Sequence, residues 1–242
     1  MTPEVKDRLK YLRTTYVFAG IPLAIIFWLI LVPLGLIRVR GLKRLLDMTR
    51  GDLVLPNHES MWELPLMVAL YAYQYILHPF LRRVYTAAAI ENFFGKWWSW
   101  VIESCLIPIY RQGTIDSEVD RKQRNFESMA HASKILKGGG VVIIYGGGGR
   151  RMANDEDNLR ADNGVELRAF NKGPAKVAID SGARITPVWI EWTWLYQKGW
   201  VSIPRRMHIS IGEFMEVQPK ERDKALTTRI ESALLNLANR SW

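Results

Sequence analysis

Short apolar runs alternate along most of the chain with stretches of helical periodicity. The apolar runs predict buried strands at Asp52–Pro56, Val84–Ile90, Leu106–Tyr110, Val141–Tyr145, Ile185–Ile190 and Met207–Ile211. Apolar residues at helical spacing predict helices over Met61–Leu77, from the N-cap Ser117 to Gly138, over Gly173–Ser181, and around Leu226–Leu237. We therefore predict an α/β fold with a single mixed, partly parallel sheet flanked by helices. In the helix after Ser117, one face carries Val119, Phe126, Met129, Ser133 and Leu136.

The N-terminal segment has a different pattern. No charged residue occurs between Arg13 and Arg38, and the 22 residues Tyr16–Ile37 would span roughly 33 Å as a helix, which matches a hydrocarbon layer of about 30 Å. We predict an N-terminal membrane-inserted helix or helical hairpin, with an anchor over residues 1–44 and one catalytic domain over 45–242. Pro22 and the Pro33-Leu-Gly35 step leave a spanning helix and a re-entrant hairpin equally open, and a buried core helix is the remaining alternative.

Composition adds a basic, tryptophan-rich surface to this picture. The net charge is +9, which favours an anionic partner such as nucleic acid, an acidic lipid surface or a phosphorylated substrate. Three of the ten tryptophans, Trp97, Trp98 and Trp100, stand beside Lys96, a combination typical of a membrane interface. A basic nucleic-acid-binding protein gives no account of the uncharged N-terminal segment, so we expect no nucleic-acid partner.

The cysteine and histidine residues give no indication of a disulfide or a metal site. The single cysteine, Cys105, lies in an apolar run, and one cysteine cannot form an internal disulfide, which fits a reducing compartment. His78, His131 and His208 show no metal-ligand spacing, so we predict no metal site.

One histidine stands where an α/β fold places its active site. Asn57-His58-Glu59-Ser60-Met61-Trp62-Glu63 follows directly on the first predicted strand and opens a helix. A neutral imidazole can take a proton from a hydroxyl, and a carboxylate on its other nitrogen orients it, so His58 is the candidate general base and Glu63 its partner. On this pattern alone, a helix-capping or core histidine is the competing interpretation.

Four blocks in order resemble a known family. Asn57-His58-x4-Glu63 resembles the His-x4-Asp signature of the glycerolipid acyltransferases typified by the lysophosphatidate acyltransferases. Leu106-Ile-Pro-Ile-Tyr-Arg111-Gln112, Tyr145-Gly-Gly-Gly-Gly-Arg150, and Lys172-Gly-Pro-Ala-Lys176 followed by Ile185-Thr-Pro187 are similar to its later blocks. The resemblance implies head-group binding by Arg111, Gly148, Arg150 and Arg151, and an acyl-site or structural role for Lys172 and Pro187.

Two positions depart from the family pattern. Glu63 stands for the usual aspartate and is one methylene longer. Gly147 stands where the third block has a glutamate, which puts the acceptor head group in doubt. The glycine run also suggests a nucleotide loop, but no Gly-Lys-Ser/Thr or Gly-x-Gly-x-x-Gly follows.

The resemblance implies a membrane-bound acyltransferase with its catalytic domain on the cytoplasmic side. It would move a fatty acyl group from acyl-CoA or acyl-carrier protein to the hydroxyl of a lysophospholipid, 1-acylglycerol-3-phosphate or a related lysolipid, without a bound cofactor. The alternative is an acyltransferase-like protein that binds lipid with an altered acceptor or little catalysis, an interpretation that the missing glutamate supports.

Overall fold

The fold is taken from a computed structural model. It describes residues 20–46, 51–60, 63–77, 83–97, 99–115, 117–147, 158–198 and 201–240. Four predicted site residues, Trp98, Gly148, Arg150 and Arg151, lie outside these ranges.

A seven-stranded sheet forms the centre of the molecule, in the order β1-β9-β8-β2-β5-β3-β4. Its strands are β1 (Ile37–Arg40), β2 (Asp52–Pro56), β3 (Val84–Ala89), β4 (Leu106–Ile109), β5 (Val141–Ile143), β8 (Arg184–Lys198) and β9 (Val201–Ile211). Only the β8–β9 pair is antiparallel among these described neighbours; the other pairs are parallel. β6 (Asn158–Arg160) and β7 (Glu166–Arg168) form a separate antiparallel pair.

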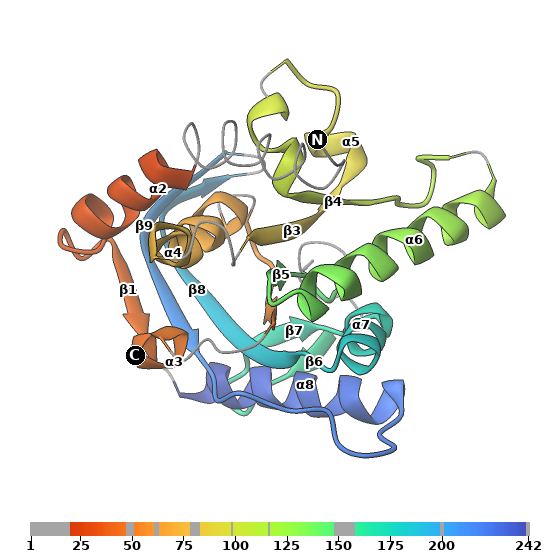
Figure 1. Cartoon of the computed structure of the whole chain (residues 1–242). Coiled ribbons are helices and arrows are strands. Elements are labelled where there is room, and N and C mark those ends of the chain that lie inside the picture. The colour runs from red at the N-terminus through yellow and green to blue at the C-terminus, as the bar shows by residue number, and fades with distance from the viewer. Residues whose placement is uncertain are drawn as a thin grey trace.

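Helices cover both faces of this sheet (Figure 1). The longer helices are α4 (Glu63–Leu77), α6 (Glu118–Lys137), α7 (Gly173–Ser181) and α8 (Asp223–Asn239); the short ones are α2 (Ile21–Ile25), α3 (Leu42–Leu46) and α5 (Ile90–Phe93), with a π-helix η2 (Ile26–Leu31) and 3₁₀ turns η3 (Ser99–Val101) and η4 (Glu103–Cys105). Alternate strand residues face opposite sides, so Val54 joins a core with α2 and α4, whereas Leu53 and Leu55 join a core with α6, α7 and α8.

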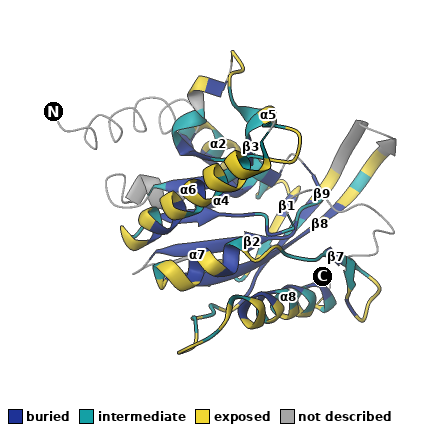
Figure 2. Cartoon of the chain, turned by 90° about the vertical axis from the view of Figure 1, so that its right-hand side faces the viewer, coloured by how far each residue is buried: buried dark blue, intermediate teal, exposed yellow. Residues whose placement is uncertain are grey.

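The fold class predicted from the sequence is confirmed: a mixed, mostly parallel sheet lies between helical layers (Figure 2). The hairpin β8–β9 runs well beyond the two apolar runs that predicted it, because its outer part alternates polar and apolar residues. α6 begins after Ser117, whose side chain accepts from the Asp120 N–H as expected of an N-cap. Its predicted apolar face packs only in the C-terminal half, and Val119 and Phe126 are 76% and 70% exposed.

The described part of the predicted anchor begins with a short helical segment, α2 and η2. Ala24 and Phe27 are buried against the core that includes α4, while Leu29 is 69% exposed on the other side. Residues Ile37–Arg40, inside the predicted anchor, form the edge strand β1 and pair with β9. Among the described helices, none is long and apolar enough to cross a membrane. The boundary at residue 44 stays a prediction.

A buried ion pair joins β2 to β8 at their first residues. Asp52 is fully buried and accepts from the Thr186 hydroxyl at 2.8 Å, and Arg184 Nε lies 3.4 Å from the same carboxylate oxygen. The Arg184 guanidinium also stacks on the Phe214 ring, with 3.5 Å to its centroid. These contacts connect the two strands on which the site depends.

We expect Arg184→Met to lower the free energy of unfolding by about 3–5 kcal/mol, because it removes the guanidinium that lies 3.4 Å from the buried Asp52 carboxylate. Chemical denaturation followed by circular dichroism measures this loss. Lys122→Met is the control. It removes the ion pair between the exposed side chains of Lys122 and Glu118 and should change stability little. Equal losses in the two variants would contradict the structural role of the buried pair.

Candidate active site

His58 and Glu63 form a direct, partly buried pair. The Nδ1 atom of His58 lies 2.7 Å from Oε2 of Glu63, and Glu63 is fully buried while the imidazole is partly exposed. Three further groups donate to the same carboxylate: the backbone N–H of Glu59, the backbone N–H of Ser60 at 2.8 Å, and the indole N–H of Trp192 at 3.0 Å. The structure therefore brings together the two residues that the sequence singled out for catalysis.

Local chain geometry explains the position of this pair. Asn57 extends the β2–β8 pairing by one residue: its side-chain amide donates to the Ile190 carbonyl at 2.8 Å and accepts from the Ile190 N–H at 2.6 Å. Ser60 and Glu63 have the spacing of a capping box, in which the acid three positions on reaches back to the N-cap N–H. The turn between strand and helix is thus held at both ends, and His58 sits between them.

The contact with Glu63 determines which nitrogen of the neutral His58 imidazole carries the proton. An ionised carboxylate only accepts hydrogen bonds, so the proton on the His58–Glu63 contact belongs to Nδ1 of the neutral imidazole. This tautomer leaves Nε2 with its lone pair. The arrangement can accept a proton at Nε2 and stabilise the resulting imidazolium through the Glu63 carboxylate.

Tyr145 packs against the imidazole. The two rings lie 4.5 Å apart at an interplanar angle of 39°, and the Tyr145 hydroxyl has no hydrogen-bond partner among the described residues. Burial, followed by the negative charge of Glu63, raises the pKa of Tyr145 well above its ordinary value. The phenol is therefore neutral and keeps its proton throughout the physiological range.

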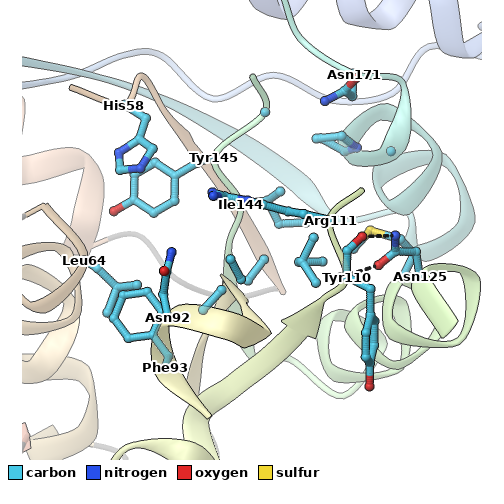
Figure 3. Close-up of a pocket in the computed structure, with 18 of the residues that line it drawn as sticks. His58, Leu64, Asn92, Phe93, Tyr110, Arg111, Asn125, Ile144, Tyr145 and Asn171 are labelled. Carbon is cyan, nitrogen blue, oxygen red and sulfur yellow. Dashed lines mark hydrogen bonds between the residues drawn. The ribbon is translucent and has the colours of Figure 1, made fainter. Parts of the chain in front are cut away.

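A cavity of about 510 Å³ opens beside His58 (Figure 3). The parallel strands β2, β3, β4 and β5 end at one edge of the sheet, and the residues just beyond them line the cavity: His58, Asn92, Arg111 and Tyr145. Helices α6 and α7 close the opposite side with Arg121, Asn125, Met129, Gly173 and Pro174. Its apolar wall includes Leu64, Ala87, Ala88, Phe93, Ile109 and Ile144.

Arg111 is held at the far side of this cavity from α4. The Asn125 side chain accepts from the Tyr110 N–H and donates to the Tyr110 carbonyl, at 2.9 and 2.8 Å, which fixes the end of β4 to α6. Arg111 follows and forms an ion pair with Glu91 at 3.6 Å, with its guanidinium partly exposed. A predicted head-group residue thus lies in the same cavity as the predicted base.

Other predicted residues lie elsewhere. Lys172 is exposed at the start of α7, and Pro187 is buried in β8 opposite Leu55; neither is among the described residues that line the cavity. Trp97 is 88% exposed and Trp100 is 51% exposed, both in the segment after α5. The roles given to these residues stay predictions.

Close packing explains why the first two positions of the glycine run carry no side chain. A Cβ atom at Gly146 would stand 2.0 Å from the Phe170 ring, and one at Gly147 would stand 3.2 Å from the Arg168 Cβ. The Asn171 N–H also donates to the Gly146 carbonyl. The space beside the loop is therefore filled by the end of β7 and the segment that follows it.

Several residues of this site were missed by sequence reasoning. Trp192 and Asn125 are far along the chain from the groups they hold, and no local spacing connects them. Arg121 and Asn171 line the cavity without belonging to a motif. The capping-box spacing of Ser60 and Glu63 was readable in the sequence and would have placed the Glu63 carboxylate at the turn.

Comparison with known proteins identifies the family. A family model described as Acyltransferase matches residues 36–191, which is more than half of the chain. The chain belongs to the Acyltransferase family. Its fold is similar to the crystal structure of the 1-acyl-sn-glycerophosphate (LPA) acyltransferase PlsC from Thermotoga maritima, with 17% identity, a TM-score of 0.62, and coverage of 100% of this chain and 85% of that one. A search of curated proteins found no match.

Family membership identifies this protein as an acyltransferase without specifying the acyl donor or the acceptor. Within the described residues, no group of three or more histidine, cysteine, aspartate or glutamate side chains could hold a metal ion. The expectations of a metal-free and cofactor-free reaction stay predictions.

We expect Gly146→Ala to destabilise the acyltransferase by about 1–3 kcal/mol, because the added methyl group must displace the Phe170 ring. Thermal or urea unfolding measures the change. Gly173→Ala is the matched control, since a Cβ there meets nothing closer than Met129 Sδ at 3.8 Å. Identical stabilities of the Gly146 variant and the wild type would show that the loop has room for a side chain.

Proposed function

We propose that this acyltransferase moves a fatty acyl group from a thioester, acyl-CoA or acyl-carrier protein, to the free hydroxyl of a lysophospholipid. The observation that carries the proposal is the 2.7 Å His58–Glu63 contact at the mouth of a cavity that also contains Arg111. The base and a cation for an anionic head group face one space, and the orienting acid is buried behind the imidazole. 1-Acylglycerol-3-phosphate or a related lysolipid is the acceptor that fits these groups.

The reaction needs one base and no covalent enzyme intermediate. His58 Nε2 takes the proton of the acceptor hydroxyl as the oxygen attacks the thioester carbonyl, and Glu63 stabilises the imidazolium. The tetrahedral intermediate then collapses with cleavage of the carbon–sulfur bond. The departing thiolate receives the proton from the imidazolium, which restores the neutral histidine and releases ester and thiol.

Arg111 would hold the acceptor phosphate. A guanidinium binds phosphate oxygens through two parallel N–H groups and fixes orientation as well as charge. Phosphate binding would compete with the Glu91 contact, which at 3.6 Å and with both side chains partly exposed is weak. A phosphate bound at Arg111 would leave the acceptor hydroxyl within reach of His58. Head-group binding would thus position the hydroxyl for attack.

The first experiment measures transfer from labelled acyl-CoA and acyl-carrier protein to a panel of lysolipids. We expect His58→Ala to lose at least about a hundredfold in kcat, the usual contribution of a general base. Glu63→Gln should lose much more than Glu63→Asp, because only aspartate keeps the charge that stabilises the imidazolium. His131→Ala, on the exposed side of α6, is the control.

Two outcomes would contradict this function. Transfer by His58→Ala at the wild-type rate would remove the base, and equal rates for the two Glu63 variants would remove the acid. Lysolipid binding by the wild type without turnover across all donors would instead support the lipid-binding alternative.

Membrane association is part of the same proposal. Exposed aliphatic side chains cluster on α2, η2 and the turn that follows: Ile25, Ile26, Leu29, Ile30 and Leu34. The segment after α5 adds the exposed Trp97 and Trp100, and both segments lie at the end of the molecule opposite α8 (Figures 1 and 2). A face of aliphatic and indole side chains on a chain of net charge +9 suits an anionic bilayer surface, on the cytoplasmic side.

We expect the pair Leu29→Ser and Trp97→Ser to weaken flotation of the full chain with anionic phospholipid vesicles by about tenfold, because burial of these side chains contributes to partitioning. Val119→Ser and Phe126→Ser change two side chains of similar exposure on α6 and should leave flotation unchanged. Release of the wild type by high salt alone, without detergent, would contradict insertion and favour purely electrostatic binding.

A further inference from the structure

Trp192 reaches the catalytic pair from β8, on the face of the sheet that α4 covers. It lies in β8, is 8% exposed, and donates its indole N–H to Glu63 Oε1 at 3.0 Å. Among the described residues, it is the one side chain besides His58 that hydrogen-bonds to this carboxylate. The remaining donors are backbone N–H groups of the turn itself.

Contacts on two sides fix the position of the Trp192 indole. Two residues before it, the backbone of Ile190 is held by both polar atoms of Asn57, so β8 is registered against the residue that precedes His58. On its other side the Trp192 ring stacks on Trp194, with centroids 5.2 Å apart and an angle of 18°. One short stretch of β8 therefore fixes the positions of both His58 and the acid.

The two carboxylate oxygens of Glu63 face different side chains. Oε2 faces the His58 Nδ1, Oε1 accepts from Ser60 and Trp192, and the Glu59 N–H lies within hydrogen-bond distance of both oxygens. The indole hydrogen bond at Oε1 resists rotation of the carboxylate about its terminal bond, which would turn Oε2 away from the imidazole.

We propose that Trp192 is a positioning residue for acyl transfer, whose indole N–H holds the Glu63 carboxylate in the orientation that keeps His58 ready as the base. This inference rests on the proposed function. It assigns to β8 a part in catalysis in addition to its part in the fold. Trp192 acts through Glu63 and need not touch substrate.

The proposal predicts a rate effect without a binding effect. Without the indole N–H, the carboxylate rotates more freely and Oε2 spends less time in contact with His58 Nδ1. The imidazole is then less often oriented as the base, so kcat falls, whereas the residues that line the cavity are unchanged.

The central test is Trp192→Phe in the full chain. We expect kcat to fall about tenfold, the typical effect of losing a hydrogen bond to a charged group, with both KM values within about twofold of wild type. Trp194→Phe is the matched control, because it keeps an aromatic ring in the same stack and removes an indole that does not bond to Glu63 in the structure.

A wild-type kcat in Trp192→Phe would overturn the proposal, as would an equal loss in Trp194→Phe. If Trp192→Phe does not fold, benzothienylalanine at position 192 replaces the N–H with sulfur and keeps the ring shape. Full activity of that isostere would likewise overturn it.

A double-mutant comparison tests the contact itself. Glu63→Asp withdraws the carboxylate by about 1.5 Å, one carbon–carbon bond, and so separates it from the indole. Trp192→Phe should then cost less than about twofold in the Glu63→Asp background. A full tenfold loss in both backgrounds would show that Trp192 acts elsewhere.

A spectroscopic readout separates this inference from the proposed function. The His58 imidazole nitrogen resonances, assigned by their loss in His58→Ala, are compared by NMR in wild type and Trp192→Phe at the same pH. A changed Nδ1 chemical shift in the variant supports the contact even if no lysolipid is acylated, in which case the proposed function alone fails. An unchanged shift, or the same change in Trp194→Phe, would overturn the positioning role.

Discussion

The buried carboxylate of Glu63 is the constraint on which the site depends. A charged group with no solvent contact must have every acceptor position satisfied, and here the donors come from the turn after β2, from His58 and from β8. Because these donors belong to segments far apart in the chain, the carboxylate is held only when sheet and turn are both formed. Catalytic geometry and folding are therefore coupled at one side chain.

The sheet supplies the rest of the site through the ends of its strands. The four parallel strands β2, β5, β3 and β4 end on the same side, and each is followed within a few residues by a group that lines the cavity. Two asparagine amides reinforce these strand ends: Asn57 pairs with the Ile190 backbone and Asn125 with the Tyr110 backbone. His58 follows Asn57 and Arg111 follows Tyr110, so both are placed by rigid backbone rather than by mobile loops.

The two departures from the family pattern have structural counterparts. Glu63 is long enough to meet the Ser60 N–H, the imidazole and the indole of Trp192 at once. Gly147 lies beside Arg168, so the third block borders a cation where the family pattern has an acid. The first change keeps the contact with His58, whereas the second leaves the loop after β5 without the carboxylate of the family pattern.

The sequence by itself determined the α/β class, the N-cap at Ser117, and the candidate pair His58 and Glu63, because hydrophobic periodicity and short-range spacing are local properties. Only the tertiary structure decided that Trp192 bonds to Glu63, that Asn125 holds the strand before Arg111, and that Val119 and Phe126 stay exposed. Those facts depend on strand order and on how far a helix extends past the sheet. Long-range packing sets both, and no local pattern encodes them.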